Sequence, residues 1–316
     1  MTQPTHLLGV DIGGTNLRVA LSNADGEIVA RTSATTTNLR DAESVVRQIG
    51  ECAHRLLQDA HLPLGGVAAI GAGAPGLTNA VTGVVIATSY LMGWRDVPLK
   101  AMLEDELGIP ASVDNDVNLA ALGESCFGVG RGCPEFVFLA IGTGVGAGII
   151  VKGELFQGAA WTAGEIGYML VPGVSEEPAA LGKPGGLEGV VGGEGLRTQW
   201  RSQWSTEKTQ LSQELSATEI FDAAIAGDGL ANVLLDRAAR ALAYTIFDIT
   251  LILNASLYVL GGSVGLHAAL RERTQAVVDM YARRLHPKLV LSALGNDAQL
   301  MGAIRLAQIA SSQPIG

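Results

Sequence analysis

The stretch Leu7-Leu-Gly-Val-Asp-Ile-Gly-Gly-Thr-Asn-Leu-Arg-Val-Ala-Leu21 decides the fold. Apolar residues dominate Leu7–Asp11, and apolar residues alternate with others along Leu17–Leu21, so both segments are predicted to be strands. They flank Ile12-Gly-Gly-Thr15, which is typical of a β-hairpin closed by a glycine turn. A third strand near Ile28–Arg31 would extend this hairpin into a meander.

The same arrangement occurs a second time. The apolar segment Phe136–Ile141 is followed by Gly142-Thr-Gly-Val-Gly146 and then by the apolar segment Ala147–Val151. Strands and helices alternate between and after the two copies, which predicts an α/β fold. Further strands are expected at Val67–Gly71, Ala111–Val113 and Leu257–Leu260, and helices at Asp41–Ala60, Leu99–Leu107, Val117–Cys126, Leu230–Asn254 and Asp297–Ile309.

The chain length favours two domains. A chain of 316 residues exceeds the size at which one hydrophobic core usually stops growing. We place the boundary after Asn115 and expect the last helix to return to the first lobe. The predicted lobes are residues 1–115 plus 297–316, and residues 116–296.

Composition narrows the class of protein and of partner. Hydrophobic residues make up 48% of the chain and charged residues 16%, which is typical of a chain with large buried sheets. The net charge is −10 with no basic run, so we expect no nucleic-acid partner. The three cysteines, Cys52, Cys126 and Cys133, suit a reducing cytoplasm, and no apolar run predicts secretion or a membrane span.

The glycine turns are candidate phosphate sites. Glycine lets an anion approach backbone N–H groups, a threonine hydroxyl can donate a hydrogen bond, and a carboxylate at the strand end can hold Mg²⁺ directly or through water. The alternative is that these turns only close hairpins. The candidate nucleotide-binding residues are Asp11, which is also the candidate magnesium ligand, Gly13, Gly14, Thr15, Gly142, Thr143, Gly144, Gly261 and Gly262.

Two other glycine motifs also bind nucleotides, the P-loop and the dinucleotide fingerprint. No G-x-x-x-x-G-K-[ST] sequence is present, so a P-loop is excluded. Gly71-x-Gly-x-x-Gly76 matches a dinucleotide fingerprint, but Pro75 lies inside it and no amphipathic helix follows. A nicotinamide-dependent dehydrogenase therefore stays open as an alternative.

Candidate residues for the acceptor lie in Val113-Asp-Asn-Asp-Val-Asn-Leu119, where a predicted strand passes into a helix. Asp116 can accept a proton from an attacking hydroxyl, and Asn115 can bind a neighbouring hydroxyl. The alternative is that Asp114 or Asn115 is only the N-cap of this helix and Asp116 an acidic residue of its first turn. Glu165 and Glu188 lie in glycine-rich loops and suit vicinal sugar hydroxyls, or they are solvated charges.

In this order, the motifs resemble those of the ROK family of bacterial sugar kinases and sugar-responsive repressors. The resemblance spans nearly the whole chain and consists of short motifs. They are Asp11-Ile-Gly-Gly-Thr15, Gly73-x-Pro-Gly76, Gly93-Trp94, Asn115-Asp-Val-Asn118, Gly123-Glu124, Gly142-Thr-Gly-Val-Gly-x-Gly148, Gly164-Glu-Ile-Gly167 and Gly261-Gly262.

The resemblance implies a two-lobed, actin-like ATPase fold of the ribonuclease H-like type, with a cleft between the lobes. It implies transfer of the γ-phosphoryl group of ATP, with Mg²⁺, to a hexose or N-acetylhexosamine, as in a glucokinase, and a homodimer or homotetramer. Asp116 matches the family's catalytic base. Asn115 and Glu165 match its sugar-binding positions, and Glu188 matches the acidic residue that ends its zinc motif. The full set of candidate substrate-binding residues is Gly76, Asn115, Asp116, Glu165, Tyr168 and Glu188.

Two departures from the family pattern concern the zinc site and the sugar. Tyr168 stands where the family usually has histidine, and residues 179–188 contain none of the family's cysteines, so we expect no zinc. Before Gly93-Trp94 the family's asparagine is missing. Tyr90 and Tyr168 can stack on a sugar or simply pack.

These departures also leave a second function open, a sugar-sensing regulator of the same fold. The family's repressors carry an N-terminal helix-turn-helix. Because the phosphate motif begins at Asp11, we expect no such domain here.

Overall fold

The computed structural model describes residues 4–37, 39, 41–88, 91, 93–174, 183–282 and 284–312. The chain forms two compact units. Unit 1 contains Met1–Gly128, Gln157–Thr162 and Asp297–Gly316, and unit 2 contains Val129–Phe156 and Ala163–Asn296.

Unit 1 is built on a five-stranded sheet with the order β3-β2-β1-β4-β8. The strands β1, β2 and β3 form the expected antiparallel meander, and β4 and β8 run parallel to β1. A second sheet, β5-β6-β7, was not predicted because its strands are very short. The bounds are β1 His6–Ile12, β2 Asn16–Asn23, β3 Ile28–Thr35, β4 Val67–Ala74, β5 Leu77–Asn79, β6 Val84–Ala87, β7 Arg95–Val97 and β8 Ala111–Asn115.

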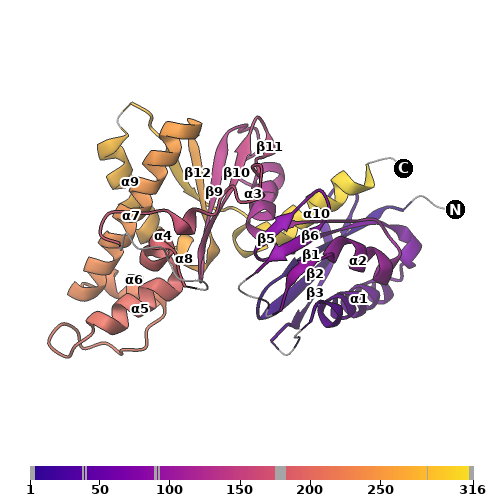
Figure 1. Ribbon diagram of the computed structural model, residues 1–316, viewed down its shortest axis with the longest axis horizontal. Coiled ribbons are helices and arrows are strands. Elements are labelled where there is room, and N and C mark those ends of the chain that lie inside the picture. Colours follow the sequence, from indigo (N-terminus) through magenta and orange to yellow (C-terminus); the bar gives the residue numbers. More distant parts are fainter. Residues whose placement is uncertain are drawn as a thin grey trace. The chain divides into compact units, whose positions relative to one another are not determined.

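Helices cover both faces of the large sheet of unit 1 (Figure 1). Leu8 and Val10 point to one face and pack with α1 (Ala42–Asp59) and α2 (Leu99–Leu107), whereas Leu7 points to the other and packs with α10 (Ala298–Ser311). This division follows from the alternation of side chains along a strand.

The observed boundary of unit 1 differs from the expected one after Asn115. The unit continues through α3 (Asp116–Phe127) to Gly128. The reason is packing: α3 lies against α10, and an added Cβ at Gly123 would stand 2.4 Å from the carbonyl oxygen of Ala298. Helices in backbone contact belong to one unit.

Unit 2 repeats the topology of the large sheet of unit 1. Its order is β11-β10-β9-β12-β13, again with an antiparallel meander followed by two parallel strands. The repeat of the glycine-turn motif in the sequence thus corresponds to a repeat of the sheet. The bounds are β9 Phe136–Ile141, β10 Val145–Val151, β11 Glu154–Leu155, β12 Leu257–Gly261 and β13 Lys288–Leu291.

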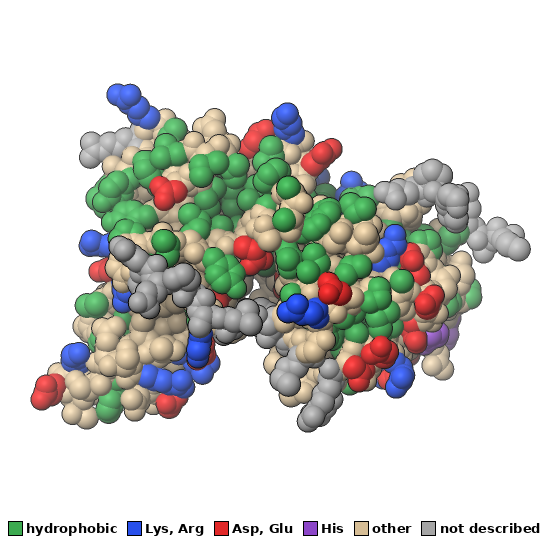
Figure 2. Space-filling model, viewed as in Figure 1, with side chains coloured by type: hydrophobic (Ala, Val, Ile, Leu, Met, Phe, Trp, Pro, Cys, Tyr) green, Lys and Arg blue, Asp and Glu red, His purple; other side chains and the backbone are tan. Residues whose placement is uncertain are grey.

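The helices of unit 2 pack on this sheet around one buried core. They are α4 Gly186–Val191, α5 Gly193–Gln203, α6 Ala217–Ile225, α7 Gly229–Leu253, α8 Gly262–Gly265 and α9 Ala268–Tyr281. The described part of the chain also has short 3-10 helices, which are η1 Leu64–Gly66, η2 Ile166–Tyr168 and η3 Gly295–Asp297. Hydrophobic side chains also gather on the surface of unit 2 over the region of α7 and α9 (Figure 2). In the described ranges, no helix has the length and hydropathy needed to cross a membrane.

Candidate active site

Three parallel strands of unit 1 bring the candidate residues of this unit to one edge. In the strand register, Asp11 of β1 pairs with Gly73 of β4, and Gly73 pairs with Asp114 of β8. The carboxyl ends of these strands therefore meet, which is where ligands bind in open α/β sheets. Asp11 and the segment that begins at Asp114, separated by about a hundred residues in the sequence, share this edge.

Asp11 forms an ion pair that the sequence analysis missed. Arg18 donates from Nε and from Nη2 to the same oxygen, Asp11 Oδ2, at 2.9 and 2.6 Å. The two residues face each other across the β1–β2 hairpin, so only the strand register identifies the pair. Burial raises the pKa of Asp11, and Arg18 partly opposes this by stabilising the charged form. Since both of these bonds go to Oδ2, Asp11 fits the role of a magnesium ligand through Oδ1.

The first glycine turn is held by one hydrogen bond within its own backbone and by two from Thr36. The Gly13 N–H donates to the Asn16 carbonyl at 2.8 Å, and the Thr36 hydroxyl donates to the Gly13 carbonyl at 2.8 Å. The Thr36 N–H in turn donates to the carbonyl of Thr15. These bonds fix the carbonyl groups of the turn, while the side chain of Thr15 is exposed.

Asp114 is a buried support for the residues that follow it. Its carboxylate accepts from the Asn115 N–H at 2.7 Å, from Asn118 Nδ2 at 3.0 Å and from Gln157 Nε2 at 2.6 Å. Burial raises the pKa of Asp114, and these hydrogen bonds partly counteract the rise. Both carboxylate oxygens accept hydrogen bonds from within unit 1, so Asp114 orients the start of α3.

Of the two candidate caps, Asp114 and Asn115, the structure shows Asn115 as the N-cap of α3. Its Oδ1 accepts from the N–H groups of Val117 and Asn118, and its Nδ2 donates to the carbonyl of Gly76 at 2.9 Å. These bonds leave one N–H of the amide for a ligand. Gly76 has φ +96°, and an added Cβ would stand 2.3 Å from the Ala87 carbonyl, so only glycine fits.

Asp116 is the first residue of α3 and is half-buried. An added Cβ at Gly73 would stand 3.8 Å from the Cβ of Asp116, which is an ordinary van der Waals distance, so the end of β4 lies next to this residue. The capping bonds of Asn115 and the carboxylate of Asp114 thus set the position of Asp116. Both the capping interpretation and a catalytic role are compatible with this geometry.

The dinucleotide fingerprint at Gly71 to Gly76 has a structural explanation. An added Cβ at Gly71 would stand 2.0 Å from the carbonyl oxygen of Ala303, so this glycine lets α10 approach β4. After Gly76 the chain enters the strand β5, not a helix. A dinucleotide fold needs a helix N-terminus there for the pyrophosphate, so this segment does not form that site.

In unit 2, the second glycine turn lies against the start of α5. The Gly193 N–H donates to the Gly142 carbonyl at 2.8 Å, and the Glu194 N–H donates to the Thr143 carbonyl at 3.3 Å. The exposed Thr143 hydroxyl makes no hydrogen bond to any described residue. At Gly142 an added Cβ would meet nothing within 4 Å, so packing does not require glycine there. Gly142 thus leaves open space beside the turn.

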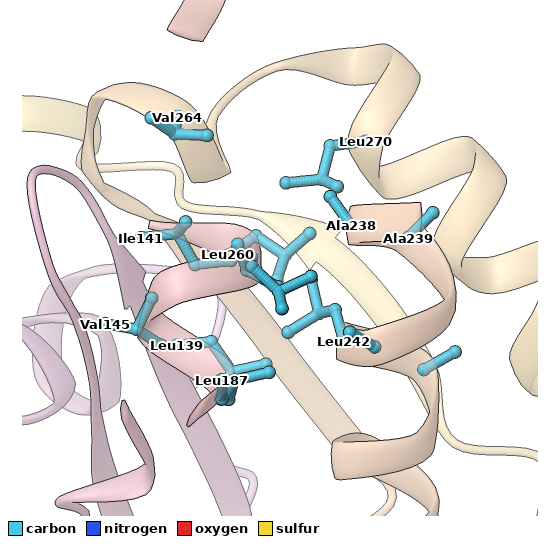
Figure 3. Packing of buried hydrophobic residues seen from close by; sticks show 14 of the residues in the cluster. Leu139, Ile141, Val145, Leu187, Ala238, Ala239, Leu242, Leu260, Val264 and Leu270 are labelled. Atoms are coloured by element: carbon cyan, nitrogen blue, oxygen red, sulfur yellow. The ribbon is translucent and has the colours of Figure 1, made fainter. Parts of the chain in front are cut away.

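The third glycine turn adjoins the second. Gly262 has φ +80°, and its added Cβ would stand 2.4 Å from the Ile141 carbonyl, so glycine is required. An added Cβ at Gly193 would stand 2.9 Å from the Gly142 carbonyl and 3.4 Å from Val264. The residues Gly192-Gly193 therefore belong to the same site, and their only sequence signal was Gly192-Gly-Glu-Gly195. Figure 3 shows Ile141 and Val264 among the buried hydrophobic side chains of unit 2.

The two glutamates of unit 2 lie close together. Glu188 Oε2 accepts from the Val145 N–H at 2.9 Å, directly after the second glycine turn. Although Glu165 as a whole is exposed, packing around its carboxyl group raises its pKa, and the nearby charge of Glu188 raises it further. The structure thus brings Glu165, Glu188 and the turn at Gly142 to Gly144 together.

Tyr168 and residues 183–188 of the segment that corresponds to the family's zinc motif are among the described residues. Tyr168 ends η2 with 62% of its surface exposed, so it is not a core residue of unit 2. The described residues contain no group of three or more His, Cys, Asp or Glu arranged to hold a metal. Tyrosine at 168 and the absence of cysteine from residues 179–188 do not fit a zinc site. Tyr90 and residues 179–182 lie outside the described residues.

The model of the ROK family matches residues 7–310. The chain belongs to the ROK family. A glucokinase of Halalkalibacterium halodurans is 33% identical over 309 residues, which cover 93% of this chain and 92% of that protein. A xylose repressor of Caldicellulosiruptor bescii, also similar, is 26% identical over 95% of this chain and 77% of that protein.

Solved structures of the ROK family agree with the fold. A ROK hexokinase from Thermus thermophilus superimposes with a TM-score of 0.81 and 27% identity, covering 96% of this chain and 98% of that chain. The predicted α/β fold, a two-lobed, actin-like ATPase, is confirmed.

Proposed function

We propose that this ROK protein is a cytoplasmic, glucokinase-like sugar kinase that transfers the γ-phosphoryl group of ATP to a hydroxyl of a hexose or N-acetylhexosamine. The observation that carries the proposal is the sheet edge of unit 1. Asp11 lies there beside a glycine turn, and Asp116 lies where two neighbouring strands end. A phosphate-side carboxylate and a second carboxylate at the same edge suit phosphoryl transfer to an alcohol.

Each group has a part in this chemistry. Asp116 accepts the proton of the attacking sugar hydroxyl, and the remaining N–H of Asn115 binds an adjacent hydroxyl of the acceptor. Gly76, whose carbonyl Asn115 fixes, shapes the same part of the sugar site. Glu165 and Glu188 accept hydrogen bonds from other sugar hydroxyls, and Tyr168 packs on the sugar ring.

The glycine turns hold the nucleotide. Gly13, Gly14 and Thr15 of unit 1 bind phosphate oxygens through backbone N–H groups and a hydroxyl. Gly142, Thr143 and Gly144 do the same in unit 2, and Gly261-Gly262 lets the adenosine approach the end of β12. Mg²⁺ bound at Asp11, directly or through water, would neutralise charge on the transferred group.

A sugar panel with Mg-ATP and a coupled ADP assay tests the proposal. Asp116→Asn keeps the size of the side chain but removes the base, so we expect turnover to fall by about 10²- to 10⁴-fold. Binding of ATP, followed by calorimetry, should change little. The matched control is Asp105→Asn on the exposed surface of α2, which should retain full activity. The proposal is contradicted if, for every sugar in the panel, the wild-type protein releases no more ADP than Asp116→Asn does.

The alternative function is a non-catalytic, sugar-sensing regulator. Two observations favour it, the tyrosine at position 168 and the similarity to a xylose repressor over 95% of this chain. A regulator would bind a sugar in calorimetry yet release no ADP with it. The same panel therefore separates the two functions.

A further inference from the structure

A short segment of the chain, Gln157–Thr162, lies outside unit 2 and belongs to unit 1. Unit 2 resumes at Ala163, directly before the candidate sugar-binding residue Glu165. The segment forms neither a helix nor a strand. In the described part of the chain, its residues make a single hydrogen bond, from the side chain of Gln157 to Asp114. This one side chain therefore supplies the polar contact that holds the segment in unit 1.

The backbone of the segment has a conformation that its sequence does not favour. Trp161 has φ +62°, in the left-handed region that bulky residues rarely adopt. Residues persist in this region where the surrounding structure enforces it, and they concentrate at active sites. Trp161 is also half-buried, so packing holds its side chain. The segment thus has a defined position, to which the hydrogen bond of Gln157 contributes.

The partner of Gln157 is a carboxylate that is almost completely buried. Asp114 exposes 2% of its surface, and a buried carboxylate depends on hydrogen-bond donors to both of its oxygens. Two donors reach Oδ1, the Asn115 N–H at 2.7 Å and Asn118 Nδ2 at 3.0 Å. Gln157 Nε2, at 2.6 Å, is the one donor to Oδ2 among the described residues. Gln157 therefore fixes the side of the carboxylate that α3 does not reach.

The hydrogen bonds continue from Asp114 to the candidate acceptor residues. Asn118 donates its side-chain N–H to Asp114 and its backbone N–H to Asn115 Oδ1, at 3.1 Å. Asn115 in turn fixes the Gly76 carbonyl, and Asp116 follows it as the first residue of α3. Without a donor to Oδ2, the carboxylate of Asp114 could turn, and the start of α3 would move with it.

We propose that Gln157 is a positioning residue for Asn115 and Asp116, which it holds in place through its hydrogen bond to Asp114. Gln157 touches neither the sugar nor the reacting atoms in this role. The effect on turnover rests on the proposed function, whereas the placement of Asn115 can be measured without a substrate.

Removal and reversal of the hydrogen bond test the proposal. Gln157→Met has nearly the same length but no donor, and Gln157→Glu places a second carboxylate against Asp114. We expect each to lower kcat/KM for the sugar by about 10- to 100-fold, because small displacements of catalytic groups have effects of this size. KM for ATP should change little. In the double variant Asp114→Asn, Gln157→Glu the new amide donates to the new carboxylate, so most of the activity lost in Gln157→Glu should return.

Hydrogen exchange at the start of α3, followed by NMR, tests the placement without sugar or ATP. The N–H groups of Asn115 and Asn118 should exchange at least about 5-fold faster in Gln157→Met and Gln157→Glu, because their acceptors are no longer held in place. The double variant should restore their protection. The matched control is Gln58→Glu on the exposed surface of α1, which should change neither exchange nor turnover. Circular dichroism establishes that all variants are folded.

The outcomes separate this proposal from the proposed function. Unchanged exchange in Gln157→Met overturns the positioning role, and a double variant that exchanges as fast as Gln157→Glu overturns the action through Asp114. Faster exchange with unchanged kcat/KM overturns the effect on Asp116, and so does an equal rise of KM for ATP, which indicates a general loss of structure. A wild-type protein that phosphorylates no sugar contradicts the proposed function, while the exchange rates still decide whether Gln157 positions Asn115.

Discussion

Glu188 links the second glycine turn to the other glutamate of unit 2. Its carboxylate accepts the Val145 N–H and its charge raises the pKa of Glu165. Substitution by glutamine keeps an acceptor for Val145 but removes the charge, so the pKa of Glu165 should fall toward its ordinary value. If the ionised Glu165 binds sugar, KM for the sugar rises as the pH falls through this pKa. In Glu188→Gln that rise should begin at a lower pH, as steady-state kinetics across a pH series would show.

The control for this substitution is Glu188→Ala. Alanine removes the charge and the acceptor, so Val145 loses its partner and the turn at Gly142 loses a support. KM for ATP should then increase, whereas Glu188→Gln should leave it nearly unchanged. A pH profile for the sugar that is identical in wild type and Glu188→Gln contradicts the electrostatic role of Glu188.

At the scale of helices and strands, the sequence predicted the elements that have a clear local pattern of apolar and turn residues. The structure has the helix expected near Leu99–Leu107 and the strand expected at Phe136–Ile141, because the apolar pattern and the flanking turn residues define both elements locally. The strand Lys288–Leu291 was missed because four residues carry too little periodicity. The short strands of the second sheet of unit 1 escaped prediction for the same reason.

Residues of the candidate site could be predicted where a sequence motif contains them. They could not be predicted where only strand pairing or a hydrogen bond from a distant segment brings them into the site. Asp114 and Asn115 were both candidates for the helix cap, because each is a polar residue between a predicted strand and a predicted helix, and the structure shows that Asn115 is the cap. Arg18 was not recognised, because its contact with Asp11 depends on the register of two strands. The place of Gly193 in the candidate site could not be predicted either, since it depends on a hydrogen bond to Gly142 from a segment about fifty residues away.

The contact between α3 and α10 depends on glycine. An added Cβ at Gly302 would stand 1.7 Å from the carbonyl oxygen of Leu119, so the helices must separate to admit it. Alanine favours a helix by about 1 kcal/mol over glycine. Overpacking in a core costs about 1–3 kcal/mol, and here the obstacle is backbone, which cannot rotate away. We therefore expect Gly302→Ala to lower the free energy of unfolding by about 1–2 kcal/mol in urea denaturation.

Gly229→Ala is the matched control for this substitution. Gly229 begins α7, is exposed, and has nothing within 4 Å of an added Cβ, so alanine there should leave stability unchanged or slightly higher. Because α3 carries Asp116 at its start, Gly302→Ala should also reduce turnover. Equal stability of Gly302→Ala and wild type would mean that the two helices tolerate separation.

At the scale of the whole molecule, the path of the chain makes unit 1 depend on both ends of the sequence. Unit 1 begins the chain and receives residues 157–162 and then α10, whereas most of unit 2 is one segment, Ala163–Asn296. In α10, Leu300, Ile304 and Ala307 are buried against Leu7, Ala20 and Ala69 of the sheet. One face of the sheet in unit 1 is therefore completed only by the last helix.

Removal of α10 should unfold unit 1 and leave unit 2 folded. Burial of Leu300 and Ile304 alone contributes about 3–6 kcal/mol, a large fraction of the 5–15 kcal/mol that typically stabilises a domain. Without α10, β1 and β4 would expose Leu7 and Ala69 to water. In limited proteolysis of a chain that ends at Asn296, we expect residues 1–128 to be digested and fragments from both segments of unit 2, Val129–Phe156 and Ala163–Asn296, to persist. A chain that ends at Ser312 retains all of α10 and should resist digestion as the full chain does. A protease-resistant fragment of residues 1–128 from the shorter chain would show that the sheet and the helices of its other face suffice.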